Sequence, residues 1–377
     1  MNGFPAVDPI PLPAPIWLFK LLHIVTLSLH FVAMQMLIGG LLIAVLLNLL
    51  GRSPASKTAA TAVARRLTVV MTYVINLGVP PLLFAQVLYG RAIYTSSVVM
   101  GAWWIAVVPV LIVVYWLLYR FAAGLEQGRK VWWMGLGAWI GVGGIAHIYT
   151  ANMTLMLRPE VWQQMYSVSP LGTHLPTGDP TTAPRFLFFL AGGFVAAGLW
   201  LIYLAGRKTF TAIEGRFLSA LGGRIAAIAA VLQIVTAITV YRAQPAIVQA
   251  GLGSNLLYKI AGFGWLGLTA VILIYAGFAA IAKPSSTLIS WLAPALAFLS
   301  IACMTLYRDG IRDLTLLSKG YDVWARNVVT NWSVVSIFLV LFVVGLGVVG
   351  WLISVVARAT PIAETPTSAI AAQGSAL

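Results

Sequence analysis

Three histidines lie inside long apolar stretches of the sequence, where ionisable side chains are rare. His23 and His30 share one stretch, and His147 belongs to another. Ionisable residues inside a membrane are costly and usually serve a function. Imidazole is a common axial ligand of haem iron, so all three are candidates for ligating a b-type haem. Two opposed imidazoles would favour electron transfer over gas binding.

The spacing of the histidines restricts how they can pair. His23 and His30 are seven residues apart, so they share one face of a helix. They are only about 10.5 Å apart along the helix axis, which is tight for two separate haems. A site with two histidines must therefore join two helices, with His147 opposite either His30 or His23. Whether the chain holds one haem or two stays open.

Two glycines precede His147 by four and three residues, at Gly143 and Gly144. They remove side chains from the surface beside the imidazole, and a flat macrocycle needs such clearance. The alternative is a set of neutral histidines that are hydrogen-bonded between helices, with glycines that allow close helix packing.

The composition requires that these histidines be positioned by membrane helices. Of 377 residues, 60% are hydrophobic and 8% charged, and the mean hydropathy is +0.95, whereas soluble domains carry about 25% charged residues. This excludes an ordinary soluble enzyme, a disordered protein and a coiled coil. The apolar runs are too long for an outer-membrane barrel. We therefore expect an all-α polytopic bundle surrounded by membrane lipid.

About 20 apolar residues are needed to cross a hydrocarbon core. Nine segments qualify, and they form one predicted transmembrane domain over residues 1–358: 17–50, 68–96, 101–122, 131–157, 185–206, 222–243, 257–282, 287–307 and 331–357. The polar segment 359–377 is predicted to be a disordered C-terminal tail.

Basic residues predict the orientation of the chain. Lys and Arg gather in the loops after the first, third and fifth predicted helices, so we expect those loops to be cytoplasmic. This puts the N-terminus outside and the C-terminus inside, in a bacterial inner membrane. The net charge of +14 then reflects topology, and no nucleic-acid partner is expected.

One predicted outer loop, 308–330, is unusually charged. Arg308 and Arg312 are four residues apart, as are Asp309 and Asp313. If the eighth helix continues through them, the arginines lie together and the aspartates lie beside them. Arginine can donate paired hydrogen bonds to a carboxylate or to quinone oxygens, which suggests a quinol or partner site at the outer surface. The alternative is a solvated network of ion pairs.

The nine acidic residues all lie outside the middle of apolar runs. We therefore expect no carboxylate inside the bundle. Cation-coupled transporters and proton relays commonly use such carboxylates, so the pattern argues against a transporter and against oxygen reduction.

The second predicted helix contains Pro80 and Pro81, which remove backbone donors. We expect a break there. The freed carbonyls could line a cavity that includes Gln86 and Arg91 and serves quinol or a partner. A simple kink is the alternative.

Several of these stretches resemble a known family. His30-Phe31 is followed by Gly39, and the second helix ends in Tyr89-Gly90-Arg91; Ala151-Asn152, Met156 and Pro159 follow near the end of the fourth. Over residues 1–210 the chain is similar to subunit I of cytochrome bd quinol oxidases. The resemblance implies a haem ligand at His30, and quinone as the substrate.

The sequence also departs from the family pattern. The family's fifth-helix histidine ligand aligns with Phe188, and its second-helix glutamate with Leu82 or Gln86. The long quinol-binding loop is reduced to 243–256. The resemblance therefore implies a divergent relative without the oxygen-reducing machinery.

These observations predict a membrane b-type cytochrome-like subunit. It would pass electrons between membrane quinol and an extracytoplasmic acceptor, such as a cytochrome or another redox subunit, without reducing oxygen. The alternative is a cofactor-free anchor or scaffold subunit of a larger respiratory complex. The acceptor and the type of quinone stay open.

Overall fold

The computed structural model describes residues 3–6, 10–176, 178–281 and 287–358. The regular elements in this part of the chain are helices, and the predicted tail 359–377 lies outside it. The helices are α1 (Ile16–Leu50), α2 (Pro54–Val99), α3 (Gly101–Glu126), α4 (Trp132–Leu155), α5 (Pro159–Val168), α6 (Thr182–Ala205), α7 (Ala212–Arg242), α8 (Ala246–Ser254), α9 (Leu256–Ile281), α10 (Thr287–Ser290), α11 (Leu292–Ser318) and α12 (Trp332–Arg358).

Eight of the described helices are long and apolar enough to span a membrane. The number is nine if α4 and α5, which meet at a bend of 119°, count as one span. The all-α polytopic fold is therefore confirmed, and the chain is an integral membrane protein.

Two helix boundaries differ from the prediction in informative ways. α2 begins at Pro54, well before residue 68, because Ser53 caps it by accepting a hydrogen bond from the backbone N–H of Ser56 at 3.1 Å. α11 continues to Ser318 instead of ending at 307. Arg308, Asp309, Arg312 and Asp313 are therefore helical, as their spacing predicts.

The chain divides into two compact units. The first comprises Met1–Ile10 and Ile16–Arg326 and contains α1 to α11. The second comprises Pro11–Pro15 and Asn327–Leu377 and contains α12. Within the second unit, Leu12 pairs with Val328 in a short parallel bridge, which joins its two segments.

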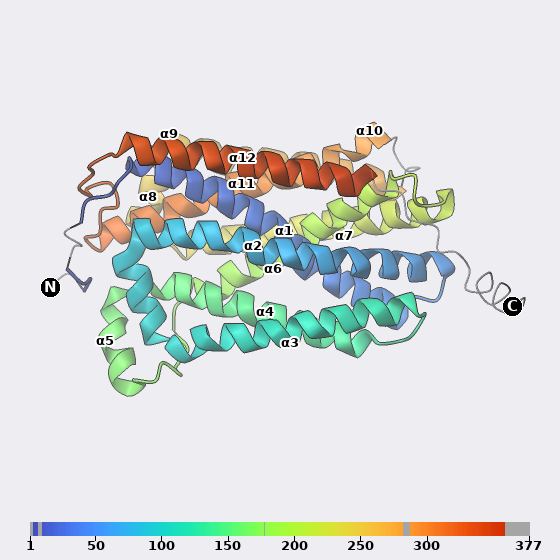
Figure 1. Ribbon diagram of the computed structural model, residues 1–377, viewed down its shortest axis with the longest axis horizontal. Coiled ribbons are helices and arrows are strands. Elements are labelled where there is room, and N and C mark those ends of the chain that lie inside the picture. Colours follow the sequence, from blue (N-terminus) through green and yellow to red (C-terminus); the bar gives the residue numbers. More distant parts are fainter. Residues whose placement is uncertain (1–2, 7–9, 177, 282–286, 359–377) are drawn as a thin grey trace, which may run out of the picture. The chain divides into compact units, whose positions relative to one another are not determined.

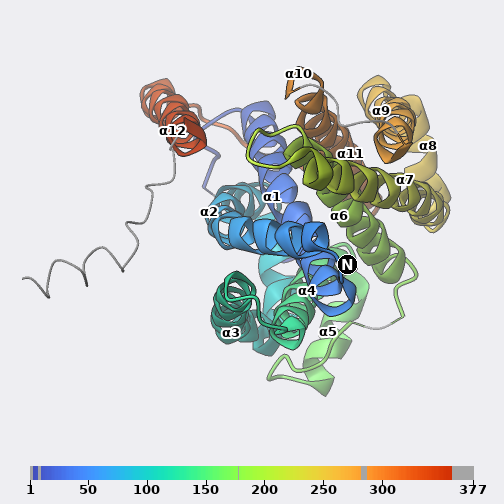
Figure 2. The ribbon, with the colours of Figure 1, turned by 90° about the vertical axis from the view of Figure 1, so that its right-hand side faces the viewer.

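α1 is the central helix of the first unit and packs against α2, α4, α6 and α11 (Figure 2). Glycines allow the closest approach. A Cβ atom on Gly39 would lie 2.1 Å from the carbonyl oxygen of Gly193 on α6. Likewise, a Cβ atom on Gly198 of α6 would lie 2.6 Å from the carbonyl oxygen of Gly222 on α7. Small residues therefore form the helix contacts, as is usual in membranes.

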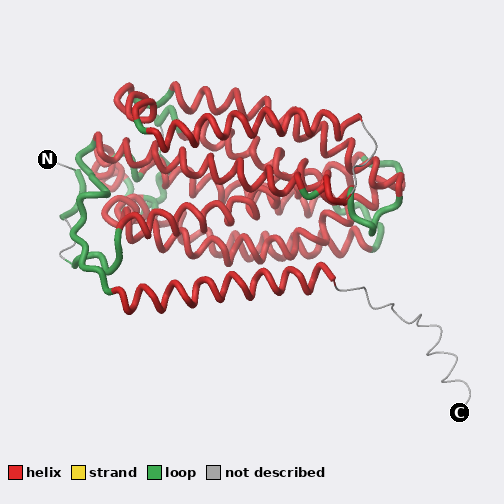
Figure 3. The backbone as a smooth tube through the Cα atoms, turned by 90° about the horizontal axis from the view of Figure 1, so that it is seen from above, coloured by secondary structure: helices red, strands yellow, loops and turns green. Residues whose placement is uncertain are grey.

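The loops of the first unit gather at the two ends of its helices (Figure 3). One end, which we call the α5 end, holds the start of α1, the junction of α2 with α3, α5 and α8 (Figure 1). The loops after α1, α3 and α6 lie at the opposite end. Within this unit, successive long helices end at alternate ends of the bundle, as the nine-span prediction requires.

Candidate functional site

A group of polar side chains is buried toward the α5 end of the bundle. We call it the buried ionic cluster; its members are Lys20 and His23 of α1, Tyr89 of α2, and Asp309, Arg312 and Asp313 of α11. Helical spacing puts the three α11 residues on one face. They meet Lys20 of α1 and Tyr89 of α2 there, more than 200 residues away in the sequence.

Lys20 joins the two carboxylates. Its Nζ donates to Asp309 Oδ2 at 2.9 Å, to Tyr89 Oη at 2.7 Å, and also to Asp313 Oδ2. The Tyr89 hydroxyl lies 2.8 Å from Asp309 Oδ1 and 2.9 Å from Asp313 Oδ1. Tyr89 has one hydroxyl proton, so it donates to one carboxylate at a time or shares the proton between them.

Arg312 connects the cluster to His23. Its Nη1 lies 3.0 Å from His23 Nε2 and 3.8 Å from Asp309 Oδ1, and its guanidinium lies over the Tyr89 ring at 4.6 Å. Because arginine only donates, His23 Nε2 accepts this hydrogen bond. His23 Nδ1 then carries the proton and donates to the carbonyl oxygen of Pro81 at 3.0 Å.

The cluster is balanced in charge and shielded from solvent. Two cations face two carboxylates, and Lys20, Asp309, Arg312 and Asp313 are 4–8% exposed. Buried charges are stable only when they are paired and hydrogen-bonded. The prediction of no carboxylate inside the bundle is therefore wrong, and so is the solvated ion-pair alternative. Hydropathy missed the acids because they lie in a polar helix end that tertiary packing covers.

Arg308 lies apart from this network. Its guanidinium lies 5.7 Å from the centre of the Phe31 ring. Among the described residues, no ion pair is recorded for Arg308, whereas Arg312 pairs with Asp309. The two predicted arginines therefore have different surroundings, although they lie one turn apart on α11.

The segment 319–326 covers the bend of α2. Tyr321 donates its hydroxyl to the carbonyl oxygen of Leu88 at 2.9 Å, and the next residue, Tyr89, has non-helical angles (φ −122°, ψ 21°). The helical angles continue through Pro80 and Pro81, so the predicted break is displaced to Tyr89. Trp324 lies over the Lys20 ammonium group, 5.8 Å from the ring centre.

The two polar residues predicted beside the break have separate surroundings. Arg91 Nε donates to the carbonyl oxygen of Pro5 at 2.5 Å, and its guanidinium lies 5.3 Å from the centre of the Tyr321 ring. Gln86 is partly buried on α2. Arg91 therefore fastens the N-terminal segment and the 319–326 segment to α2, next to the cluster.

His30 has the geometry of a histidine prepared for ligation. Its Nδ1 donates to the carbonyl oxygen of Val74 at 3.1 Å. This bond leaves the lone pair on Nε2, which is the usual arrangement in ligating histidines. A Cβ atom on Gly78 would lie 3.0 Å from His30 Cε1, so glycine makes room for the ring against α2.

His147 lies beside an apolar cavity of about 230 Å³. The apolar cavity is lined by residues of α1, α4 and α6: Ile38, Trp139, Ile140, Gly143, Phe186, Phe189 and Leu190. The His147 ring makes an edge contact with Phe186, with 5.3 Å between ring centres. A Cβ atom on Gly143 would meet no atom within 4 Å. Gly144 is exposed and does not line the cavity.

These residues fit a haem in part. His30 has a nitrogen available, and His147 lies beside an apolar space cleared by Gly143. His23 does not fit, because both ring nitrogens already have protein partners. His30 is hydrogen-bonded to Val74 of α2, whereas the ring of His147 contacts Phe186 of α6. These contacts do not bring the two histidines together, so their pairing stays a prediction.

Lys20 and Tyr89 are the functional candidates that sequence reasoning missed. Lys20 is the only charged residue in α1, and an isolated cation in an apolar run was a usable signal. Tyr89 appeared only as part of a family likeness. The α2 bend that turns its hydroxyl toward the carboxylates had no local sequence signal of its own.

Comparison with known proteins bears on the fold. No family model matches the sequence, and no curated protein matches it. The structure is similar to a chain in "The structure of bd oxidase from Geobacillus thermodenitrificans", with a TM-score of 0.64 and 13% sequence identity; the alignment covers 96% of this chain and 100% of that chain. The predicted resemblance is therefore confirmed at the level of the fold, and it extends well beyond residues 1–210.

Proposed function

We propose that the protein is a quinol-linked electron-transfer subunit of a bacterial inner-membrane complex. The observation that carries the proposal is the buried ionic cluster, two of whose members, Lys20 and His23, lie on the same helix as His30 in a bd oxidase-like fold. In this proposal the α5 end faces outward, so the cluster handles the quinol headgroup near the outer surface. The electron acceptor is an extracytoplasmic cytochrome or another redox subunit.

The cluster has the groups that a quinol headgroup needs. Lys20 and Arg312 are fixed donors for quinone oxygens, and Asp309 and Asp313 are acceptors for the hydroxyl protons. Oxidation of a quinol releases its hydroxyl protons together with an electron pair. The carboxylates would receive the protons, while hydrogen bonds from Tyr89 and Lys20 hold the carboxylates in position.

Access to the cluster would pass through the 319–326 segment. Trp324 lies over Lys20 and is 53% exposed, so its movement would uncover the ammonium group. Tyr321 and Arg91 anchor the same segment to α2. Entry of a headgroup would therefore displace the tryptophan without unfolding α11.

His30 and His147 are the residues proposed to hold a b-type haem. When bound, the haem would accept electrons from quinol and pass them on. Val74 fixes the tautomer of His30, and Gly143 keeps the space beside His147 open. Spectra of the single-histidine variants distinguish ligation by one histidine from ligation by both, and the ratio of haem to protein in the wild type gives the number of haems.

The proposal includes the absence of oxygen reduction, because the buried carboxylates lie away from the proposed haem cavity. The chain does contain buried carboxylates, but Asp309 and Asp313 are bonded to Lys20 and Tyr89. Neither lines the apolar cavity beside His147. The purified protein supplied with quinol should therefore consume no oxygen above background.

The test combines a visible spectrum with quinol reduction. The purified wild-type protein should show a reduced-minus-oxidised haem signal, and a short-chain quinol should reduce it. His147→Ala or His30→Ala should remove or convert the low-spin signal, whereas His23→Ala should leave it in place. Arg312→Gln should slow reduction by quinol without changing the spectrum. Arg65→Gln, which alters an exposed pair with Glu126, is the control.

Two results would contradict the proposal. A wild-type protein without any haem signal would leave the scaffold function in its place. Unchanged reduction by quinol in a folded Arg312→Gln variant would separate the cluster from quinol chemistry.

A further inference from the structure

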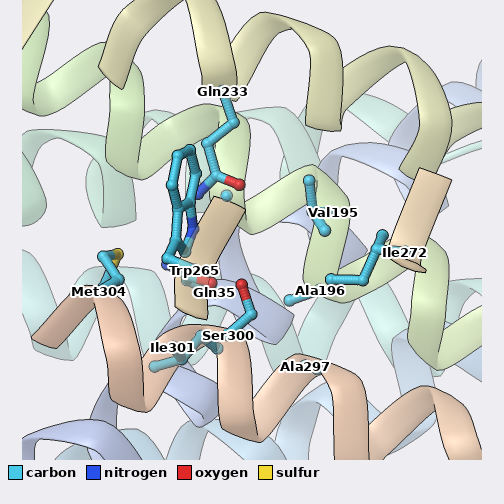
Figure 4. A pocket seen from close by; sticks show the side chains of 11 residues that line it. Gln35, Val195, Ala196, Gln233, Trp265, Ile272, Ala297, Ser300, Ile301 and Met304 are labelled. Carbon is cyan, nitrogen blue, oxygen red and sulfur yellow. The ribbon is translucent and has the colours of Figure 1, made fainter. Parts of the chain in front are cut away.

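A second polar site lies deeper in the bundle, away from the buried ionic cluster. It is a small cavity of about 10 Å³, shown in Figure 4. Four polar side chains line it: Gln35 of α1, Gln233 of α7, Trp265 of α9 and Ser300 of α11. We call it the amide pocket.

Two donors in the amide pocket are unpaired. Gln35 Nε2 and Trp265 Nε1 are both buried and have no hydrogen-bond partner among the described residues. Gln35 is 1% exposed and Trp265 is 7% exposed. An unpaired buried N–H group destabilises the folded state. Two such groups facing one cavity indicate that something accepts their hydrogen bonds.

A third donor, Gln233 Nε2, lies at the same place, beside Gly192 of α6. A Cβ atom there would lie 2.6 Å from Gln233 Nε2 and 3.0 Å from Gln35 Nε2. Both amide nitrogens therefore face the glycine surface, where a side chain would exclude them. Because the two unpaired groups, Gln35 Nε2 and Trp265 Nε1, are N–H donors, the missing group must accept hydrogen bonds.

We infer that the amide pocket binds one ordered water molecule. The cavity volume of about 10 Å³ matches the space that a single water needs. Gln35 and Trp265 would donate to the water oxygen, and its two protons would reach Ser300 Oγ and the side-chain oxygen of Gln233. The site lacks a charged side chain, so an anion would lie there without a counter-charge, at high cost.

The water would connect four helices through their polar side chains. It would join α1 to α7, α9 and α11 in the apolar centre of the bundle, where an unsatisfied polar group is most costly. This role depends only on the side chains of the pocket and holds with or without a haem.

A matched pair of tryptophan substitutions tests the inference. Trp265→Phe removes a donor to the proposed water. Trp104→Phe is the control, because Trp104 Nε1 is also buried without a partner in the described part of the chain but does not line the pocket. If water is bound, Trp265→Phe lowers the midpoint of thermal unfolding by several degrees more than Trp104→Phe does. If the pocket is dry, Trp265→Phe removes only an unpaired group, and its midpoint equals or exceeds that of the control.

Two further measurements keep the test decisive if a variant fails to fold. An experimental structure of the wild-type protein should show an oxygen-sized peak within hydrogen-bond distance of Gln35 Nε2 and Trp265 Nε1. Direct pairing of the Gln35 and Gln233 amides with no peak would overturn the inference. So would an unfolding midpoint that depends on chloride concentration at constant ionic strength, because that result would assign the pocket to an anion.

Discussion

The buried ionic cluster and the apolar cavity beside His147 use the same helix bundle in opposite ways. In the cluster, each charged group has a partner, and Tyr89 and His23 add further hydrogen bonds. The apolar cavity is lined by aliphatic and aromatic side chains and one glycine, and it is open. The difference suggests two tasks, with proton handling at the cluster and a flat apolar ligand in the cavity.

The largest expected effect is the loss of the central cation. Lys20→Met would leave Asp309 and Asp313 facing each other in a buried site. Breaking a buried pair by removing one partner costs about 3–5 kcal/mol, so we expect a large loss of stability, measured by unfolding in detergent. Adding Asp313→Leu to Lys20→Met should recover part of the loss by removing one uncompensated charge. If Lys20→Met alone unfolds like the wild type, the cluster is solvated and the comparison fails.

The second prediction concerns the apolar cavity. Gly143→Leu would fill it, because nothing now lies within 4 Å of a Cβ at that position. We expect haem content to fall severalfold while the unfolding midpoint stays close to that of the wild type. Gly144→Leu is the matched control, since Gly144 is exposed and does not line the cavity. Equal haem content in both variants would remove the cavity from the proposed haem site.

These two regions also differ in how far the sequence predicts them. Long apolar runs locate the spans, and the Gly143–His147 spacing predicts a cleared surface on α4, since both depend on neighbouring residues in one helix. The cavity itself also needs residues of α1 and α6. The cluster depends on Lys20 meeting Asp309 and Asp313, and no local pattern reports a contact across that separation. The two adjacent prolines predict a break in α2 at Pro80 and Pro81. The structure has non-helical angles at Tyr89, next to the Leu88 carbonyl that Tyr321 contacts.

A third prediction isolates the hydroxyl group of the cluster. Tyr89→Phe removes the donor to Asp309 and Asp313 and an acceptor for Lys20. The charges stay paired, so the cost should be that of unmet hydrogen bonds, about 1–3 kcal/mol. The same measurement on Tyr115→Phe is the control, because that hydroxyl lies at the surface, where it bonds to the side chains of Tyr119 and Thr72. A loss as large as that of Lys20→Met would indicate that Tyr89 also holds the α2 bend.

The smallest expected effect tests whether burial, and not pairing alone, gives the cluster its stability. Lys319 pairs with Glu160 at 3.3 Å, but these side chains are 40% and 47% exposed. Exposed pairs contribute about 0–1 kcal/mol because water screens them. Lys319→Met should therefore change the unfolding free energy far less than Lys20→Met, although each replaces a lysine paired with carboxylate. The pair should also weaken in high salt, whereas the stability of the cluster should respond little. A similar loss in both variants would mean that water reaches Lys20, and the division between a sealed polar region and an open apolar one would no longer hold.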